Sequence, residues 1–565
     1  MKFLFTQLLF FFFQHNTTKR NLVVLSKFFA FLILIVCVYS VLFNLLMMYE
    51  DRYYSWVTGF YWTMTVMSTL GFGDITFHTD LGLIFTIMVL TSGILFLLII
   101  LPFTFIQFFY APWLEAQERA RTPRKLPEDT QGHVIITSVD PITTRLIEHL
   151  NRQGIKYYIV TGDAQQASSL MDNGYQVVIG EPDRPGTYRL IQVDKAALVV
   201  VTNDDLISTN ISFTIRQVSQ DVPIVTNANN EHSIDILEYS GNISVYQFMR
   251  MLGESLSKHA FGVGQGTNII GRFDELLISE LPVRYTELEG KTLAQSGIRQ
   301  STGVTVIGML EQGKLLVSTP QTVITPRTIL MLAGSTSQLK SFNDSFTIKY
   351  EQEPDKPQVL ILGGGNVGQV AAETLAEYNI NYRIIEKREV KAEGLHRKFT
   401  TVGDAANINT LKEAGIDTAK SVIVTTHSDD MNIYLTFYCR QLRPDIQIIS
   451  RSILERNVAK LHMAGADHVM SYASLGAGTI FQLLRPNEVS LFTEGLMVIN
   501  RRAGSSLAGK TIMRSGIREK TGFSIIAIRR EGRLIVSPNP DTEIMEADEL
   551  IVIGTSVNEA VFKEL

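Results

Sequence analysis

Two long uncharged stretches dominate the hydrophobic pattern of the first fifth of this chain. No Asp, Glu, Lys or Arg occurs over the 21 residues from Phe28 to Met48, or over the 33 residues from Leu81 to Trp113. About 20 apolar residues in a helix cross the ~30 Å hydrocarbon core of a bilayer, so each stretch predicts one membrane span. At ~1.5 Å per residue the second would reach ~50 Å, so we expect it to extend beyond the bilayer.

After residue 130 the pattern changes to short apolar runs separated by amphipathic stretches. Such alternation is typical of a parallel, doubly wound sheet with helices on its faces. A first series of strands is predicted at 133–137, 157–160, 177–179 and 196–201. A comparable second series is predicted at 359–362, 382–385, 401–402 and 421–425.

The two series belong to an internal duplication, which is clearest near their ends. Residues 288–303 and 507–522 align without a gap and share 10 identities in 16 positions. Hairpin-like segments (311–314 and 531–533) and closing apolar strands (Ile329–Gly334 and Leu550–Gly554) follow. Each copy therefore predicts a nucleotide-fold lobe followed by a smaller α+β lobe. The predicted copies span residues 132–350 and 356–565, with smaller lobes at about 280–345 and 495–565.

The charged residues indicate how the chain is oriented in the membrane and argue against nucleic-acid binding. A formal net charge of −5 gives no reason to expect nucleic acid, and two cysteines do not suggest a disulfide framework. Basic residues flank both spans (Lys19, Arg20 and Lys27 before the first, and Arg119, Arg121, Arg124 and Lys125 after the second). This bias predicts a multi-pass protein of the cell membrane with both termini cytoplasmic. We assign residues 1–20 to an interfacial helix on the membrane lipid, 21–115 to the spans and their loop, and 116–131 to a linker.

The loop between the spans carries the most informative motif. A helix predicted over 55–68 precedes Thr69, Leu70, Gly71, Phe72, Gly73 and Asp74. Glycine supplies the positive φ angles with which successive carbonyls can face a dehydrated cation. The motif resembles the potassium-channel selectivity filter, usually T-V-G-Y-G-D, with Leu70 for Val and Phe72 for Tyr. Phe72 lacks a hydroxyl that could hydrogen-bond behind the filter. The resemblance implies K⁺ as the permeant ion and a tetrameric pore.

The second span contains two candidate gating positions. Gly93 lies near its middle and Leu97 one turn later, while Pro102 and Pro112 follow. In two-span channels a glycine here lets the inner helix bend, whereas a close helix-packing contact is an equally good reading of Gly93. Leu97 is a candidate for the inner mouth of the pore.

The duplicated region resembles RCK domains, the regulators of potassium conductance with TrkA-N and TrkA-C type lobes. Together with the filter, it resembles a prokaryotic two-span potassium channel with tandem RCK domains. The resemblance implies a multidomain protein in which an α-helical pore precedes two α/β Rossmann-like domains, with eight such domains in the gating ring of a homotetramer. It also allows Ca²⁺ as a ligand. The acidic pairs Asp204–Asp205 and Asp429–Asp430 are candidates, although such pairs are more often solvated or at helix starts.

The second copy carries a dinucleotide-type turn. Gly363, Gly365, Asn366, Val367 and Gly368 lie between a predicted strand and a predicted helix, where backbone N–H groups and the helix dipole favour phosphate. Glu386 ends the next strand, where an acid can bind ribose hydroxyls, and Lys387 follows it. By the resemblance, Asp404 would lie beside an adenine, and Thr425 and Arg451 would contact the far end of the ligand. We therefore expect NAD or an adenine nucleotide.

The first copy departs from this motif. Its equivalent turn, Thr137–Thr143, has no glycine but contains Asp140 and Pro141. The carboxylate would repel a pyrophosphate, so we expect no conventional dinucleotide there and a role in assembly instead. No cluster of His or Cys has zinc-type spacing along the chain.

The preferred hypothesis from the sequence is a ligand-gated potassium channel rather than an enzyme. A membrane-anchored NAD-dependent oxidoreductase would explain residues 363–368 but not the filter motif. A regulatory component of a potassium uptake or antiport system would explain the duplicated domains. The sequence leaves open which nucleotide binds and whether it activates or inhibits.

Overall fold

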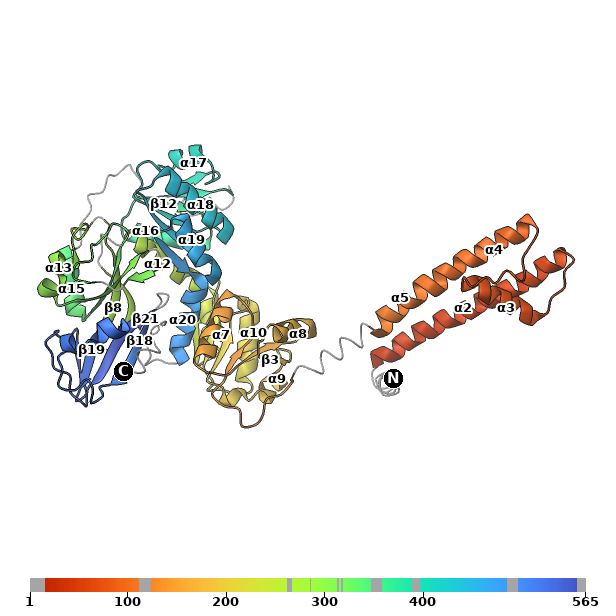
Figure 1. Cartoon of the computed structure of the whole chain (residues 1–565), viewed down its shortest axis with the longest axis horizontal. Coiled ribbons are helices and arrows are strands. Elements are labelled where there is room, and N and C mark those ends of the chain that lie inside the picture. Colours follow the sequence, from red (N-terminus) through yellow and green to blue (C-terminus); the bar gives the residue numbers. More distant parts are fainter. Residues whose placement is uncertain are drawn as a thin grey trace. The chain divides into compact units, whose positions relative to one another are not determined.

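The computed structural model describes residues 16–110, 123–261, 267–284, 286–311, 314–316, 319–346, 358–388, 397–484 and 496–555. The chain forms two compact units that divide between Pro123 and Arg124, except that residues 162–174 group with the first. Figure 1 labels some of the helices and strands of each unit.

The first unit is helical and contains both predicted spans. Its elements between residues 16 and 110 are α2 (Asn16–Tyr49), α3 (Trp56–Met67), α4 (Asp80–Gly93), the π-helical η1 (Ile94–Ile100), α5 (Leu101–Phe105) and the π-helical η2 (Ile106–Tyr110). Ser26–Tyr49 and Asp80–Phe105, of 24 and 26 residues, are long and apolar enough to cross a membrane. The second span is thus helical but changes its winding immediately after Gly93.

An aromatic cluster holds α2, α3 and α4 together. Trp62 of α3 is 3% exposed and stacks on Phe43 of α2 and Phe85 of α4, at ring-centroid distances of 4.8 and 5.8 Å. Phe77, in the loop before α4, packs edge-on against Trp62. Because aromatic side chains bury large areas at defined angles, this cluster fixes where α3 and the loop after it lie.

The structure refines the boundaries predicted around the spans. Residues 16–20, which we assigned to a separate interfacial helix, are the first turns of α2. The rest of that prediction (residues 1–15) and residues 111–122 of the predicted second-span end and linker lie outside the described residues. Leu126, in the predicted linker, is 5% exposed and packs in the core of the first α/β lobe. The linker's last residues therefore belong to the folded lobe.

The first copy begins with a six-stranded parallel sheet in the order β3-β2-β1-β4-β5-β6. Its elements in chain order are β1 (Val134–Ile136), α7 (Pro141–Arg152), β2 (Tyr157–Thr161), α8 (Ala164–Asp172), β3 (Val177–Ile179), α9 (Pro185–Leu190), η3 (Val193–Lys195), β4 (Leu198–Val201), α10 (Asp205–Arg216), β5 (Ile224–Asn227), α11 (Ser233–Glu238) and β6 (Ile243–Tyr246). The crossover helix α12 (Phe248–Phe261) leads to the smaller lobe. Strands β1 and β4 are completely buried, as expected for a parallel sheet covered on both faces.

The second copy repeats this sheet in the order β14-β13-β12-β15-β16-β17. Its elements are β12 (Val359–Leu362), α16 (Asn366–Glu377), β13 (Tyr382–Glu386), η5 (Arg397–Phe399), β14 (Thr400–Val402), α17 (Ile408–Glu413), β15 (Ser421–Val424), α18 (Asp429–Leu442), β16 (Gln447–Ser452), η6 (Glu455–Asn457), α19 (Val458–Ala464) and β17 (His468–Ser471). Helix α20 (Tyr472–Leu484) follows directly. The predicted doubly wound fold is therefore present in both copies.

Each smaller lobe is an antiparallel sheet with short helices. The first has strand order β10-β9-β11-β8-β7 and the second β18-β21-β19-β20. The first contains β7 (Asn268–Phe273), β8 (Leu276–Pro282), α13 (Leu293–Ser296), α14 (Ile298–Thr302), β9 (Thr305–Glu311), β10 (Lys314–Leu316), β11 (Ile329–Gly334) and α15 (Thr336–Phe346). The second contains β18 (Leu496–Arg502), α21 (Ile512–Ser515), α22 (Ile517–Thr521), β19 (Ser524–Arg530), β20 (Arg533–Val536) and β21 (Glu549–Thr555). The first sheet thus starts at Asn268, before the predicted boundary near residue 280, because β7 pairs with β8.

The two copies exchange their crossover helices. Helix α12 of the first copy packs on α16 of the second, and α20 of the second packs on α7 of the first (Figure 1). Gly253 of α12 permits close approach, since a Cβ there would lie 2.8 Å from the carbonyl oxygen of Val367. Ser257, one turn further, donates a 2.9 Å hydrogen bond to the carbonyl of Ala371 in α16.

The smaller lobes also share a core. Ile278 and Met331 of the first lobe pack with Ile526 and Ile551 of the second, all of them fully buried. The hydroxyl of Ser537 donates to the carbonyl of Ala333 across the same boundary at 2.8 Å. The two copies are therefore packed into a single unit with shared cores and are not two independent domains.

A Gly253→Ala substitution tests the helix exchange. The new Cβ would meet backbone and the Val370 side chain, so we expect a destabilisation of about 1–3 kcal/mol, seen as a lower calorimetric transition temperature of the full chain. Gly186→Ala in α9 is the matched control, because nothing lies within 4 Å of the position its methyl group would take and Ala favours helix by about 1 kcal/mol over Gly. Equal or greater stability of Gly253→Ala would contradict the close crossing.

Candidate functional site

The backbone of the filter segment turns its N–H groups toward the helix that precedes it. The N–H groups of Leu70 and Gly71 both donate to the carbonyl of Thr65 in α3, at 2.9 and 3.1 Å. Gly71 and Gly73 have positive φ angles of 38° and 73°, as expected from the sequence. Thr69 also has a positive φ, 62°, which is unusual for a β-branched residue. These hydrogen bonds hold the start of the filter segment against the end of α3.

Side chains of α3 hold the residues that follow the filter. The Tyr61 hydroxyl donates to the Asp74 carboxylate at 3.0 Å, and the Trp62 indole N–H donates to the carbonyl of Ile75 at 3.1 Å. These bonds anchor the end of the segment without a hydroxyl at Phe72. The sequence predicted a helix over 55–68 but not these two roles of Tyr61 and Trp62. In a single chain the side chains of Leu70 and Phe72 are 62% and 65% exposed.

Gly93 makes the helix-packing contact that was one of its two readings. A Cβ on Gly93 would lie 2.4 Å from both Cα and the carbonyl oxygen of Met67, at the end of α3. The same residue ends α4, where π-helical η1 begins. Leu97 lies in η1 and packs, partly buried, against the hydrophobic core that contains the aromatic cluster. A hinge at Gly93 and a gate at Leu97 stay predictions.

The glycine-rich turn of the second copy has the tight geometry that phosphate-binding turns need. Gly363 has a φ of 111°, and a Cβ on Gly368 would lie 1.9 Å from the carbonyl oxygen of Gly363. Helix α16 begins at Asn366, with Val367 buried beneath its first turn. The imidazole of His427 lies 3.0 Å from where a Cβ on Gly365 would be. No sequence signal indicated His427.

The acidic and basic residues predicted around this turn lie beside it. The Glu386 carboxylate, at the end of β13, accepts hydrogen bonds from the N–H of Gly364 at 2.7 Å and of Arg388 at 3.0 Å. Lys387 forms a 2.8 Å ion pair with Asp404, which lowers the pKa of that carboxyl. Both partners are largely exposed, so solvent screens the pair and it adds little stability.

Thr425 and Arg451 lie at the ends of the two neighbouring strands. The Thr425 hydroxyl donates to the carbonyl of Gly363 at 2.9 Å, which ties β15 to the turn. Arg451, in β16, is 4% exposed, and its Nε has no hydrogen-bond partner among the described residues. Burial lowers the pKa of Arg451, against the opposing charge of Asp429. A buried guanidinium with an unused donor is suited to an anion such as phosphate.

In the first copy, polar side chains fill the equivalent turn. One Asp140 oxygen accepts the N–H of Thr143 at 2.8 Å, and the other accepts the hydroxyl of Thr202 at 2.5 Å. Ser138 bonds to Thr202 at 2.7 Å as well. A carboxylate of the chain thus caps the start of α7, the place where a dinucleotide phosphate would bind in the second copy. This supports the prediction that the first copy holds no conventional dinucleotide.

The acidic pairs weighed as cation ligands have other partners. Asp204 caps the start of α10 and Asp205 is buried, accepting the N–H groups of Asn229 and Asn230 at 2.8 and 3.1 Å. Asp429 is buried in the same manner by the loop after β16. The expectation that such acids are solvated or at helix starts is therefore confirmed at the helix starts, where backbone N–H groups replace water around Asp205 and Asp429.

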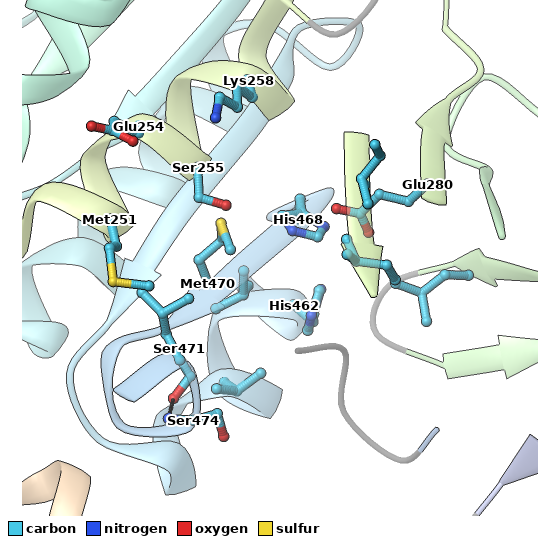
Figure 2. Close-up of a pocket in the computed structure, with 16 residues that line it drawn as sticks. Met251, Glu254, Ser255, Lys258, Glu280, His462, His468, Met470, Ser471 and Ser474 are labelled. Atoms are coloured by element: carbon cyan, nitrogen blue, oxygen red, sulfur yellow. Dashed lines mark hydrogen bonds between the residues drawn. The ribbon is translucent and has the colours of Figure 1, made fainter. Parts of the chain in front are cut away.

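A cavity of about 250 Å³ lies away from the glycine-rich turn and was not predicted. Figure 2 shows Met251 and Met470 on one side of it and Glu280, His462 and His468 on the other. Its wall combines helix α12, the first smaller lobe and the end of the second parallel sheet. The residues are far apart in sequence, so no local motif could reveal it.

These features define a class of protein: a two-span channel unit joined to a duplicated nucleotide-fold regulator. Comparison with protein families matches residues 27–110 to the ion channel family, residues 134–247 and 359–472 to the TrkA-N domain, and residues 278–347 and 496–565 to the TrkA-C domain. The chain belongs to the family of potassium channels with RCK domains.

Individual relatives agree with this assignment. The solved structure of the GsuK channel bound to NAD is 37% identical, with a TM-score of 0.57, and the match covers 96% of this chain and 99% of that one. The GsuK RCK domain is 35% identical with a TM-score of 0.56, covering 80% and 99%.

Two curated relatives come from Methanocaldococcus jannaschii. Potassium channel protein 1 is 33% identical over 208 residues, which are 35% of this chain and 62% of that protein. Probable potassium channel protein 2 is 30% identical over 222 residues, 36% and 65% of the two chains. This chain therefore spans just under two thirds of the length of these two relatives.

Asp429→Asn tests whether this acid is a structural anchor. Its carboxylate accepts hydrogen bonds from the N–H groups of Ile453 and Leu454 at 2.7 and 3.0 Å and from the Asn457 amide at 2.9 Å. We expect Asn to lower stability by about 1–3 kcal/mol, since its NH₂ cannot accept these bonds. Asp430→Asn is the matched control, because Asp430 is exposed. Equal transition temperatures of the two variants in calorimetry would contradict this role.

Proposed function

We propose that this protein is a K⁺-selective channel whose opening depends on a nucleotide bound to its second RCK copy. One observation carries the proposal: a single chain contains both the filter segment and the duplicated regulatory domains. The N–H groups at the start of the filter segment donate hydrogen bonds to α3. The match to the GsuK channel over 96% of the chain supports it. Carbonyl oxygens of the filter would replace the hydration shell of K⁺.

The pore requires several chains. One chain provides one filter strand, and its apolar Leu70 and Phe72 side chains, exposed in a single chain, would be covered by neighbours in a ring. We propose a homotetramer, with eight RCK domains forming a gating ring. Both termini would be cytoplasmic, as the basic residues near the span ends indicate, in the inner membrane of the cell.

The nucleotide would bind at the turn before α16. The N–H groups at the start of α16, which have no side-chain cap, and the buried Arg451 favour phosphates, while Glu386 lies where ribose hydroxyls would be. GsuK has been solved with NAD bound, which supports NAD or a related adenine nucleotide here. In this proposal Asp404 and Thr425 complete the site at its edges. Divalent cations such as Ca²⁺ at the ring are a further family-level proposal.

Binding would be transmitted to the pore through the inner helix. A ligand shifts a gate only by binding one of its states more tightly than the other. In the duplicated region α12 and α20 connect the two copies, so a change at α16 would reach the first copy through the exchanged helices. Gly93 and Leu97 would be the positions where the inner helix bends or constricts.

Two other functions are separable by experiment. Steady consumption of NADH by the purified chain would favour a membrane-anchored oxidoreductase. Absence of K⁺ flux in liposomes containing only this chain, with each nucleotide tested, would favour a regulatory component of an uptake or antiport system.

Substitutions in the filter test conduction. Gly73→Ala should abolish K⁺ flux into liposomes, because Ala is strained at a φ of 73°. Phe72→Tyr is the matched control and should retain flux, since it only adds the hydroxyl common in potassium channels. Flux through Gly73→Ala at the wild-type rate would contradict the filter assignment.

Glu386→Ala tests the nucleotide site. Loss of a charged acceptor for ribose hydroxyls should weaken NAD binding roughly tenfold or more, measured by calorimetric titration of the full chain. Glu377→Ala, an exposed glutamate at the end of α16, should leave the affinity unchanged. If Glu386→Ala binds NAD with unchanged affinity, Glu386 does not contact the nucleotide, and this conclusion does not depend on the flux experiments.

A further inference from the structure

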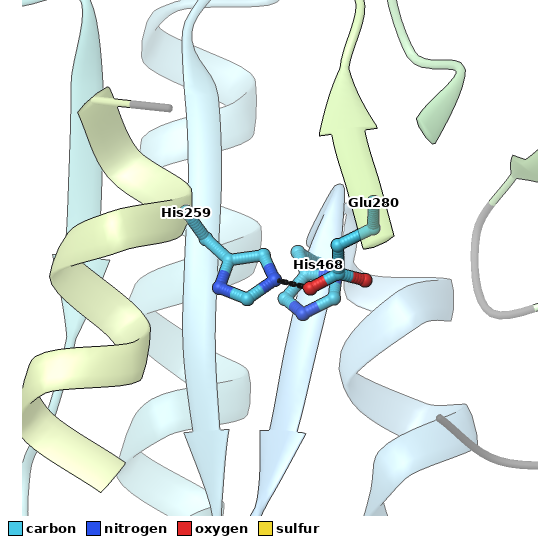
Figure 3. Close-up of side chains that lie close together, drawn as sticks. All are labelled: His259, Glu280 and His468. Atoms are coloured by element: carbon cyan, nitrogen blue, oxygen red, sulfur yellow. Dashed lines mark hydrogen bonds and ion pairs between the residues drawn. The ribbon is translucent and has the colours of Figure 1, made fainter. Parts of the chain in front are cut away.

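Three ionisable side chains meet in the interior of the duplicated region. His259 comes from the last turn of α12, Glu280 from β8 of the first smaller lobe and His468 from the start of β17 (Figure 3). They are 2%, 2% and 8% exposed, and one potential ligand atom of each lies within 4.8 Å of the others. The three elements come from both copies, so only the folded unit brings these groups together.

The hydrogen bonding of His259 prepares it to coordinate. Its Nδ1 bonds to the carbonyl of Ser255 at 2.7 Å, which requires the proton on that nitrogen. Its Nε2 then points at the Glu280 carboxylate, with which it forms an ion pair. The Glu280 carboxylate thus places a negative charge and a second donor atom against Nε2, the ring nitrogen that a metal ion would take.

His468 lies against this pair. Its ring stacks on that of His259 at a centroid distance of 4.0 Å. In the described part of the chain, neither ring nitrogen of His468 has a hydrogen-bond partner. A buried histidine whose ring nitrogens make no hydrogen bond can offer one of them to a metal ion.

We propose that His259, Glu280 and His468 form a binding site for a divalent transition metal ion of the Zn²⁺ type. Two imidazoles and one carboxylate are a donor set of zinc sites that keep a fourth position open. Zinc ligands at ~2.0–2.1 Å in tetrahedral geometry are roughly 3.3 Å apart, so the present spacing needs only side-chain adjustment. The bond from His259 Nδ1 to Ser255 is the orienting contact that metal-bound histidines usually have. Ca²⁺ and Mg²⁺ prefer oxygen ligands and suit this set poorly.

The cavity in Figure 2 gives the ion a route to the site. Glu280 and His468 form part of its wall, and its volume of about 250 Å³ holds several waters. A water from this cavity can take the fourth position on the ion. The site is therefore buried but not sealed.

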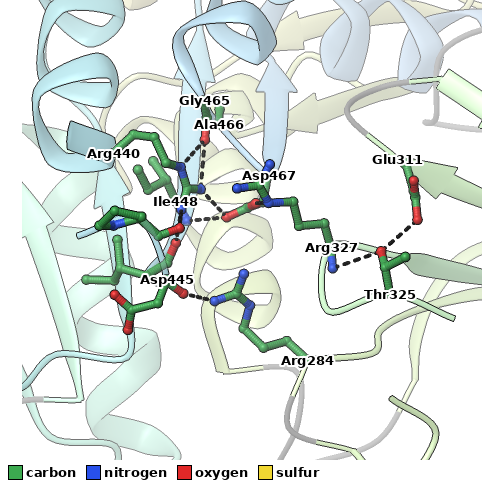
Figure 4. Close-up of polar contacts among 12 residues, drawn as sticks. Arg284, Glu311, Thr325, Arg327, Arg440, Asp445, Ile448, Gly465, Ala466 and Asp467 are labelled. Carbon is green, nitrogen blue, oxygen red and sulfur yellow. Dashed lines mark hydrogen bonds and ion pairs between the residues drawn. The ribbon is translucent and has the colours of Figure 1, made fainter. Parts of the chain in front are cut away.

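A polar frame next to the site holds its backbone in place. Asp467, which precedes His468, accepts bonds from Arg440 and from the N–H of Ile448, at 2.7 and 2.8 Å (Figure 4). Arg327 of the first smaller lobe approaches the same carboxylate at 3.8 Å, and Arg284 donates to the carbonyl of Asp445. The start of β17 is thus tied to β8's lobe, which preorganises the ligands. A bound ion would link α12, the first smaller lobe and the second parallel sheet.

Metal retention by the full chain tests the site. The tag-free protein in detergent is stripped with a chelator, incubated with ZnCl₂, desalted and analysed for zinc by mass spectrometry. We expect about one zinc per chain in the wild type and a rise of its calorimetric transition temperature with zinc but not with MgCl₂. His468→Gln should lose both effects. His462→Gln, which alters another histidine of the same cavity wall, should keep both.

Cobalt gives a readout that does not depend on any variant folding. Co²⁺ bound by the wild-type chain should show the intense visible absorption of a four-coordinate site, and Zn²⁺ should displace it. Failure of the wild type to retain zinc, or equal retention by wild type and His468→Gln, would overturn the proposal. None of these measurements involves K⁺ flux or nucleotide, so they are independent of the proposed channel function.

Discussion

The exchange of crossover helices is the constraint on which the duplicated region depends. Because α12 packs on α16 and α20 packs on α7, neither copy can complete its core without the other. The contact is close enough to need Gly253, and it is reinforced by Ser257. The same exchange brings His259 at the end of α12 against β17 of the other copy. Packing between the copies thus determines both the stability of the unit and the location of the buried cluster.

Much of this fold follows from local sequence patterns. Uncharged stretches predicted both spans, and the apolar runs assigned as strands match observed strands to within one or two residues, with 177–179 and 359–362 matching β3 and β12 in full. These elements are determined by burial of contiguous residues, which sequence displays directly. The strand β7 and the π-helical η1 were not predicted, since one depends on pairing with β8 and the other on helix winding after Gly93.

The candidate sites also fall into those that local sequence predicted and those that only the tertiary fold assembles. The turn at Gly363–Gly368 and the acid Glu386 were predictable because glycines, strand and acid lie in order along one βαβ unit. His427, the cavity and the cluster of His259, Glu280 and His468 were not, since their members are separated by up to 209 positions and meet only through the exchanged helices. A search for zinc-type spacing along the chain therefore found nothing, although the required residue types were present.

Because of Asp140, the helix that follows the first strand of the sheet is capped by a side chain in the first copy but not in the second. The Asp140 carboxylate is part of the chain and caps α7, so this negative group cannot leave the helix start as a free anion can. Any anion that binds before α16 must instead exchange with solvent. The duplication therefore pairs a helix start that the chain itself caps with a carboxylate, at α7, with a helix start that has no side-chain cap, at α16.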